Sequence, residues 1–407
     1  MDKKRIFFII LFILTTIGFG IALYLVFFAP DKPTDNGSTG TETGTNTNQP
    51  FPQAPTAGDR TPISTDRPTT PTAGDRNGTT PGGASDDTTD TAITRAPVLG
   101  ISVGSGGDLR FYNKQDGKFY EKQADGTLKT MSDNTFYNAE SVTWAKTSDK
   151  AVIEYPDGSN IIYDFATKKQ VSLPKHWEEF SFSPLEDTIV AKSITIAPEN
   201  RYLVTADTSG KNINYIAALG ENAHKVIVDW SPNKQVVAFS KTGEALGADR
   251  QEILLVGTNK ENLPSLTVEG RGFTSQWSPT GEKILYSVYN KQNEYKPELW
   301  IVNGNGDTIG TERKALRINT WPNKCVFEDD RFVYCGVPNS LPTGAGYAPQ
   351  IADSIDDTIY RIDTTTGART EIQTPDTYTV EHMTLSDDGR TLYITDTQTN
   401  GLFSIPL

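Results

Sequence analysis

Few residues in this sequence have the types and spacing that chemistry requires, and the two cysteines are the clearest. Cys325 and Cys335 flank the segment VFEDDRFVY, which has the pattern of a two-stranded hairpin with its turn near Asp330. Such a turn places the cysteines directly opposite each other, within the reach of a disulfide. We expect a disulfide rather than a metal site, because no histidine lies nearby in the sequence.

A serine motif that is typical of hydrolases occurs near the start of the repeat region. The run GISVG, centred on Ser102, matches G-x-S-x-G. That motif needs a strand, a sharp turn and a helix, whereas glycines and another strand follow here. We therefore assign Ser102 to a structural strand.

His176, His224 and His382 show no metal-ligand spacing, so we predict no catalytic residue, no metal ligand and no cofactor.

The elements that must position any site are short apolar strands in a repeating pattern. The plainest copies are VDWSPNKQVVAFS at Val228–Ser240 and TSQWSPTGEKILYS at Thr274–Ser287, each with two strands around a polar turn. A third copy, FSFSPLEDTIVAKS, lies at Phe180–Ser193, and weaker copies begin at Gly100, Val142, Cys325 and Met383. Seven hairpins at intervals of about 40–45 residues match the period of a propeller blade. We expect an all-β propeller over residues 91–407 with seven blades, and six or eight blades are the alternatives.

The seventh blade has only three strands after Val380, so a fourth strand must come from elsewhere. Ala92–Arg95, just before blade one, can supply this strand and close the ring. Closure is required because an open ring would expose strand edges and blade faces. Equivalent aromatic residues are expected to fill the wedges between neighbouring blades; these are Trp144, Phe182, Trp230, Trp277 and Phe327.

Residues 1–29 have the pattern of a membrane anchor. Ile6–Phe28 carries no charge, and as a helix it spans about 34 Å, enough for a hydrocarbon core of about 30 Å. Lys3, Lys4 and Arg5 keep the N-terminus in the cytoplasm by the positive-inside rule. A cleaved signal peptide would have a shorter apolar run that ends in small residues. We therefore predict one uncleaved transmembrane helix and an extracytoplasmic propeller, at the cell surface or in the periplasm.

Residues 30–90 differ from both neighbours. They are rich in Thr, Pro, Gly and Asp and nearly lack aliphatic side chains, so we predict a disordered linker.

The whole chain has 51 acidic and 38 basic side chains and a formal charge of −13. Because nucleic-acid binding needs a basic surface, we predict no nucleic-acid partner.

The repeat pattern resembles a known family. The sequence hydrophobic–x–Trp/Phe–Ser–Pro–x–Gly, plainest at Gln276–Tyr286, is similar to the WD40-like, TolB-type propeller repeats of bacterial proteins. The resemblance extends from about Ala92 to Leu407. It implies a rigid extracytoplasmic platform that binds a protein or a polymer. No partner residue of that family can be matched position by position, so the resemblance assigns none.

Loop length is the most informative irregularity. The connections between the second and third strands lengthen in blades four to six, at Lys241–Gln251, Asn290–Glu298 and Pro338–Asp357. Such loops share one face of a propeller, and insertions on one face often mark the binding face. The candidate contact residues on or beside them are Tyr289, Tyr295, Trp321, Tyr347 and Arg250. The alternative is that these loops are tolerated surface insertions.

Two functions fit these observations. The first is a membrane-anchored, non-catalytic platform that binds an extracytoplasmic protein or an envelope polymer such as a polysaccharide. The second is a propeller hydrolase or lyase that acts on surface glycans, with carboxylates near the axis as the acid and base.

Overall fold

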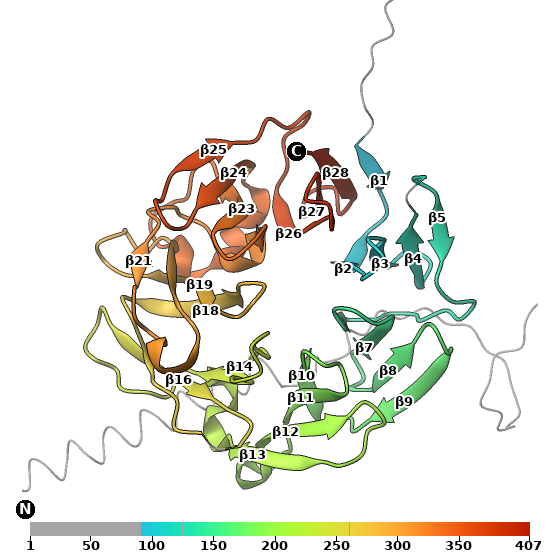
Figure 1. Cartoon of the computed structure of the whole chain (residues 1–407), viewed down its shortest axis with the longest axis horizontal. Helices are drawn as coiled ribbons and strands as arrows, with labels where there is room; N and C mark the ends of the chain where they lie inside the picture. Colours follow the sequence, from blue (N-terminus) through green and yellow to red (C-terminus); the bar gives the residue numbers. More distant parts are fainter. Residues whose placement is uncertain (1–90, 124, 260) are drawn as a thin grey trace, which may run out of the picture. The chain divides into compact units, whose positions relative to one another are not determined.

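Alternating apolar residues form seven four-stranded antiparallel sheets, which the computed structural model arranges around a central axis (Figure 1). The structure describes residues 91–407 apart from residues 124 and 260. The middle strands of each blade are buried on both faces, as in β7 (Lys150–Glu154) and β8 (Asn160–Asp164). Each blade is covered on both sides by its neighbours, and this explains the continuous apolar runs of these strands. The prediction of a seven-bladed propeller is confirmed for this part of the chain.

The strands of blades one to six follow the chain from the axis outwards, and blade seven differs only in its outermost strand. Blade one has β2 (Val98–Val103), β3 (Leu109–Asn113), β4 (Lys118–Lys122) and β5 (Leu128–Thr130). Blade two has β6 (Ser141–Trp144), β7, β8 and β9 (Lys169–Leu173). Blade three has β10 (Trp177–Phe182), β11 (Thr188–Ser193), β12 (Tyr202–Asp207) and β13 (Asn214–Ala218). Blade four has β14 (Val226–Val228), β15 (Ala238–Ser240), β16 (Gln251–Val256) and β17 (Leu266–Val268).

The remaining blades follow the same order. Blade five has β18 (Arg271–Trp277), β19 (Lys283–Tyr289), β20 (Glu298–Asn303) and β21 (Lys314–Ala315). Blade six has β22 (Cys325–Phe327), β23 (Phe332–Pro338), β24 (Asp357–Asp363) and β25 (Arg369–Glu371). Blade seven has β26 (Val380–Leu385), β27 (Thr391–Asp396), β28 (Leu402–Pro406) and β1 (Ala92–Thr94). Short 3₁₀ turns lie in the connections, at Pro198–Asn200, Gly220–Lys225, Gly306–Thr308, Pro322–Lys324, Ala345–Tyr347 and Pro349–Ser354.

The first described strand closes the ring. β1 pairs with β28 in antiparallel register, with Ala92 opposite Phe403 and Thr94 opposite Leu402. The Ser404 N–H donates to the Thr91 carbonyl at 2.8 Å and extends this pairing. Blade seven is therefore completed by residues from the other end of the described chain, as the sequence predicted.

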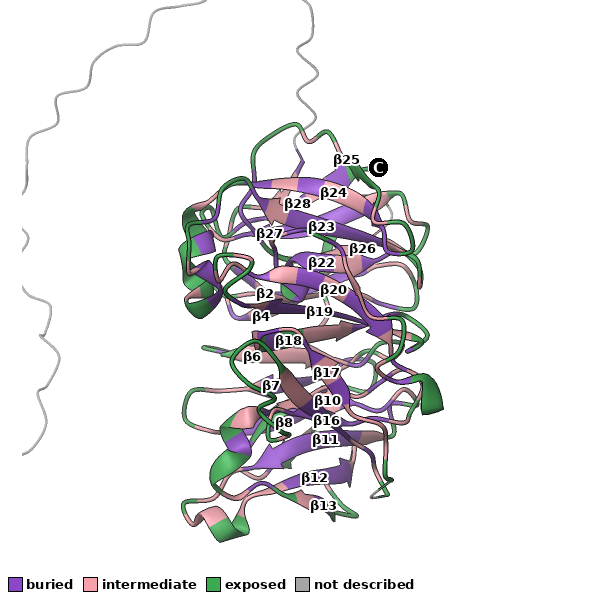
Figure 2. Ribbon diagram, turned by 90° about the vertical axis from the view of Figure 1, so that its left-hand side faces the viewer, coloured by how far each residue is buried: buried purple, intermediate pink, exposed green. Residues whose placement is uncertain are grey.

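The wedge aromatics pack between blades, as expected. The Trp277 ring stacks on Phe239 of blade four with 5.3 Å between centroids, and Trp144 meets Phe119 of blade one edge-on at 5.5 Å. Phe182 and Phe327 lie in equivalent apolar clusters with blades two and five. Figure 2 shows the result from the side, with buried strands stacked inside and exposed residues in the connections. These interblade clusters form the core of the described region.

The two ends of the ring differ. At one end, the turns between the first and second strands are joined across blades by side chains, in the pairs Arg110–Asp149, Glu186–Ser148, Asn233–Gly281 and Asp330–Thr280. At the other end lie the connections between the second and third strands and the links between blades. We call this second end the loop face. The long loops of blades four, five and six all lie on it.

The cysteine hairpin has the predicted register. Cys325 of β22 lies opposite Cys335 of β23, with 4.1 Å between their Cα atoms, and a disulfide joins them. Both side chains are buried in the cluster between blades five and six.

The predicted anchor at Ile6–Phe28 and the predicted linker at residues 30–90 lie outside the described residues. Within the described part of the chain, no helix has the length and apolar character that a membrane span requires.

Candidate binding face

Three of the candidate residues come together on the loop face. The Tyr347 ring lies 4.5 Å from that of Tyr289 and 5.3 Å from that of Tyr295, measured between centroids. Tyr347 is 62% exposed, whereas the other two are half-buried. We call these three residues the tyrosine cluster. Tyr289 ends strand β19 and Tyr295 lies on the loop that follows it, whereas Tyr347 comes from the loop of the neighbouring blade six.

Backbone hydrogen bonds hold these two loops together. The blade-five loop (residues 290–297) and the blade-six loop (residues 339–356) are joined by Gly344 N–H to the Glu294 carbonyl at 2.9 Å and by Gly346 N–H to the Tyr295 carbonyl at 2.8 Å. Glu294 and Tyr295 have positive φ values of 58° and 55°, a conformation that side-chain-bearing residues rarely adopt. Such local strain persists only where the surrounding contacts fix the backbone. The loops therefore present a defined surface.

Two glycines allow the base of the cluster to pack closely. A Cβ atom at Gly346 would lie 2.5 Å from the Tyr289 ring, and one at Gly272 would lie 2.3 Å from it. Gly272 also has a φ of 70°, at a bulge in β18. Burial raises the pKa of the Tyr289 hydroxyl, and the neighbouring Tyr347 adds to this rise. The Tyr289 ring is thus fixed between blades, while Tyr347 is the exposed member.

Trp321 does not belong to the contact surface. It is 6% exposed and packs with Leu341, Ala345 and Ala352 in a small apolar cluster under the blade-six loop. The Trp321 ring lies in the link between blades five and six, and the long blade-six loop folds over it. The expectation that Trp321 contacts a partner is corrected to a supporting role for this loop.

Arg250 is exposed on the blade-four loop, but its charge is paired. Its guanidinium donates to both carboxylate oxygens of Glu269, at 2.8 and 3.3 Å, and Arg313 contacts the same carboxylate at 2.7 Å. No described contact joins Arg250 to the tyrosine cluster. Arg271 connects the two regions, because it donates to the Arg250 carbonyl and lies opposite Tyr289 in the sheet.

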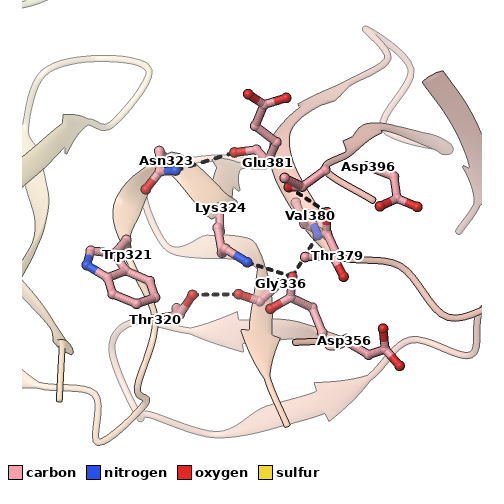
Figure 3. A network of polar contacts seen from close by, with 12 residues as sticks. Thr320, Trp321, Asn323, Lys324, Gly336, Asp356, Thr379, Val380, Glu381 and Asp396 are labelled. Carbon is pink, nitrogen blue, oxygen red and sulfur yellow. Dashed lines mark hydrogen bonds and ion pairs between the residues drawn. The ribbon is translucent and has the colours of Figure 1, made fainter. Parts of the chain in front are cut away.

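A buried ion pair lies beneath the blade-six loop (Figure 3). The Lys324 Nζ is 2.8 Å from Asp357 Oδ2, and the same oxygen accepts the Val380 N–H at 2.7 Å. Burial raises the pKa of Asp357 to about 6, and the attraction of Lys324 opposes this rise. The Asp357 side chain has no exposed surface, so it cannot reach a substrate. The ion pair ties the link before blade six to the end of the blade-six loop, and the hydrogen bond from Val380 joins Asp357 to blade seven.

The innermost strands carry a ring of mostly polar residues around the axis. The residue directly before each wedge position is half-buried in every blade: Ser102, Thr143, Ser181, Asp229, Gln276, Val326 and Thr384. Ser102 lies in β2 and accepts a hydrogen bond from Arg110, which agrees with its structural assignment. Asp229 is the one carboxylate of this ring. Burial raises its pKa to about 7, and no described side chain compensates its charge.

The sequence pointed to the three tyrosines that meet on the loop face, but not to the burial of Trp321 or to the residues that position the rings. The contacts of Gly272 and Gly346 with Tyr289 were not predicted, because neither glycine lies near Tyr289 in the sequence. The axial ring was also missed. The sequence does contain a pattern that indicates this ring, because the residue before the wedge position is polar in six of the seven repeats.

The comparisons with known proteins concern the fold. No family model matches this sequence, and no curated protein matches it. An oligogalacturonate lyase in complex with manganese aligns over 79% of this chain and 94% of its own, at 12% identity and a TM-score of 0.54. The β-propeller domain of Myceliophteria thermophila Cps50 (Swd1) aligns over 78% of this chain and 98% of its own, at 11% identity and a TM-score of 0.53.

The tricorn protease also aligns over 80% of this chain, at 13% identity and a TM-score of 0.49, but this chain spans only about a third of its length, 35%. At these identities the similarities show the fold alone. The oligogalacturonate lyase and the Cps50 domain support the propeller architecture. A shared fold does not imply a shared function, so these similarities assign neither a ligand nor a reaction to this chain.

Proposed function

We propose that this chain is a membrane-anchored, extracytoplasmic propeller that acts as a non-catalytic binding platform for a protein or an envelope polymer. The tyrosine cluster on the loop face is the observation that carries this proposal. Tyrosine provides a large contact area at a low entropic cost, and aromatic anchors dominate many binding surfaces. Here the rings are held in place by two hydrogen-bonded loops on a closed scaffold, which is the arrangement that favours binding.

The location is proposed on sequence grounds. The uncharged run Ile6–Phe28 and the preceding basic residues support an anchor with a cytoplasmic N-terminus, and residues 30–90 would separate the propeller from the membrane. The disulfide between Cys325 and Cys335 suits an oxidising compartment outside the cytoplasm.

Retention by native envelope material tests the binding proposal. The full chain, held in a nonionic detergent, is immobilised and compared with Tyr347→Ala and with the control Tyr215→Ala. Tyr215 is 64% exposed and lies on the outermost strand of blade three, away from the long loops. We expect envelope material to be retained by the wild type and the control and lost from Tyr347→Ala. Equal retention by all three proteins, or retention by none, would contradict the proposal.

The orientation has its own test. Protease added to intact cells is expected to release the propeller region, and the released fragment should contain Cys325 and Cys335 in oxidised form. Complete protection of the region, with the cells shown to be intact, would contradict the extracytoplasmic location.

A lyase or hydrolase acting on surface glycans is the second candidate, and Asp229 favours it. A carboxyl group near the propeller axis with a pKa near 7 suits a general base. The structural neighbours include an oligogalacturonate lyase, at 12% identity. Incubation of the full chain with acidic glycans, followed by analysis of the chain length of the products, separates the two candidates. Cleavage that Asp229→Asn abolishes would favour the enzyme.

A further inference from the structure

A pocket of about 470 Å³ lies on the loop face where blade four meets blade five. Its lining includes three basic residues, Lys225, Lys241 and Arg271, together with Asn222, Thr242 and Gln251. No Asp or Glu is among the lining residues. This is an unusual composition for a chain whose formal charge is −13.

The three basic residues come from different elements that the fold brings together. Lys225 ends the link before β14, Lys241 follows β15, and the Lys241 N–H donates to the Lys225 carbonyl at 2.9 Å. Arg271 begins β18 of the next blade. Its guanidinium donates to the carbonyls of Ala245 and Arg250, at 3.0 and 2.7 Å, and so fixes the blade-four loop over the pocket.

The positive charges of this pocket lack carboxylate partners among the described residues. Three carboxylates around the pocket have other partners. Glu179, which attracts Lys241, pairs with Lys192 at 2.6 Å; Glu252 accepts from Ser265 and from the Glu244 N–H; Glu269 pairs with Arg250 and Arg313. Burial lowers the pKa of Lys241, the charge of Lys192 lowers it further, and the attraction of Glu179 opposes this fall. Three basic groups gathered without a direct ion pair create a local positive potential, which favours an anionic ligand.

The neutral residues and the surroundings of the pocket narrow the ligand class. Asn222 lines the pocket with an amide group, Gln251 adds its amide oxygen while its Nε2 donates to the Lys241 carbonyl at 2.9 Å, and the Thr242 hydroxyl hydrogen-bonds that of Ser240 at 2.8 Å. The remaining capacity of these groups suits a ligand that carries hydroxyls beside its acidic group. The tyrosine cluster adjoins the pocket, because Arg271 pairs with Tyr289 across the β18–β19 ladder. Sugar rings pack well against tyrosine faces, which are apolar with a polar edge.

We propose that this pocket binds the carboxylate of an acidic polysaccharide, and that neighbouring sugar rings lie on the tyrosine cluster. This inference rests on the proposed binding function and specifies its ligand. The carboxylates of an acidic peptide would also pair with the basic residues of the pocket. Such a peptide lacks the ring hydroxyls with which the amide and hydroxyl groups of the pocket would form hydrogen bonds. The acidic polysaccharide is therefore the ligand class that the observations favour.

Calorimetric titration of the full chain in nonionic detergent tests the inference. The probes are a galacturonate hexamer, a glucose hexamer as the neutral control and a glutamate hexamer. We expect the galacturonate hexamer to bind, with an affinity that falls as salt rises, and the other two probes to bind at least about tenfold more weakly. Tighter binding of the glutamate hexamer, or equal binding of the glucose hexamer, would overturn the inference.

Matched variants locate the binding. Lys225→Gln/Lys241→Gln removes two charges from the pocket without touching the hydrogen bonds of Arg271. Lys146→Gln removes an exposed charge from the opposite end of the ring and serves as the control. We expect the double variant to lose at least about tenfold in affinity for the galacturonate hexamer, with an unchanged melting temperature, and the control to bind like the wild type.

Failure of this inference is distinguishable from failure of the binding proposal. One outcome is that Tyr347→Ala no longer retains envelope material while the double lysine variant still does. The proposal of a binding platform is then supported, and the proposal that the pocket binds an acidic polysaccharide is overturned. If neither variant changes retention, the proposed binding face itself is overturned.

Discussion

Asp229 and Asp357 are both carboxyl groups whose pKa is raised by burial, but they differ in their partners. Asp357 has Lys324 within 2.8 Å, whereas Asp229 has no described charge partner. Removing a charged group from water costs free energy that only a partner can offset. The two residues therefore respond to substitution in different ways.

We expect Asp229→Asn to stabilise the propeller at alkaline pH. The folded pKa near 7 exceeds the unfolded value of about 3.9, so the folded state binds more protons between these values, and stability falls as pH rises through this window. Asp229→Asn removes the ionisable group and therefore this loss of stability at higher pH. Its melting temperature should exceed that of the wild type by at least roughly 2–4 °C at about pH 8, since this is the shift that only about 1 kcal/mol produces, and equal it at about pH 4.

Asp388→Asn is the control for this prediction. Asp388 is an exposed turn residue whose pKa is lowered, first by its hydrogen bond from Ser386 and then by that from the Arg390 N–H. Its substitution should give no gain at alkaline pH. If Asp229→Asn shows the same pH profile as the wild type, the carboxylate is not destabilising.

We expect Lys324→Met to destabilise the propeller by about 3–5 kcal/mol, because it leaves the buried Asp357 without its counter-charge. Adding Asp357→Asn should recover most of this loss, since the amide is neutral and its oxygen still accepts the Val380 N–H. Denaturant unfolding of both variants measures the difference. Equal losses in the single and double variants would show that the charge is not the cause.

The wedge residues act at the scale of the blade. Trp277 is 7% exposed and stacks on Phe239, so it joins blades four and five. Its indole Nε1 is buried and has no hydrogen-bond partner among the described residues. The packing of the ring, rather than its N–H group, therefore supplies the stabilisation at this position.

We expect Trp277→Ala to cost about 3–5 kcal/mol, through lost burial and the cavity that remains. Trp277→Phe should cost less than about 2 kcal/mol, because it keeps an aromatic ring and removes the unpaired donor. Blades three and six already have phenylalanine at this position, Phe182 and Phe327. Urea midpoints of the two variants check the order, and a larger loss for the phenylalanine variant would contradict it.

Particular residues show what the sequence allowed us to predict. The repeat aromatics and the turn between Cys325 and Cys335 revealed the blades, because their pattern recurs or is local. The burial of Trp321 was not visible, since the loop that covers it begins about twenty residues later and follows no repeat. Lys225, Lys241 and Arg271 look like ordinary surface charges in the sequence. Only the ring brings them into one pocket.

At the scale of the whole molecule, β1 holds the ring closed. Deleting Ala92–Thr94 would expose the edge of β28, whose unpaired backbone groups favour association with other chains. We expect the deletion to lower the melting temperature and to produce oligomers in size-exclusion chromatography. Deleting three residues just before the ring, Asp87–Thr89, should do neither. A monomeric β1 deletion variant with a wild-type melting temperature would contradict the role of closure.

The position of this closing strand also has a mechanical consequence. Any tension on the chain before Thr91 acts first on β1, which holds to the outer edge of blade seven through a short ladder with β28. Ala92 and Ile93 also pack against two of the interblade clusters, so these contacts carry the load together with that ladder. Pulling from the N-terminal side would therefore detach β1 first and open the ring at blade seven, so the resistance of the propeller to force is set by a strand of three residues.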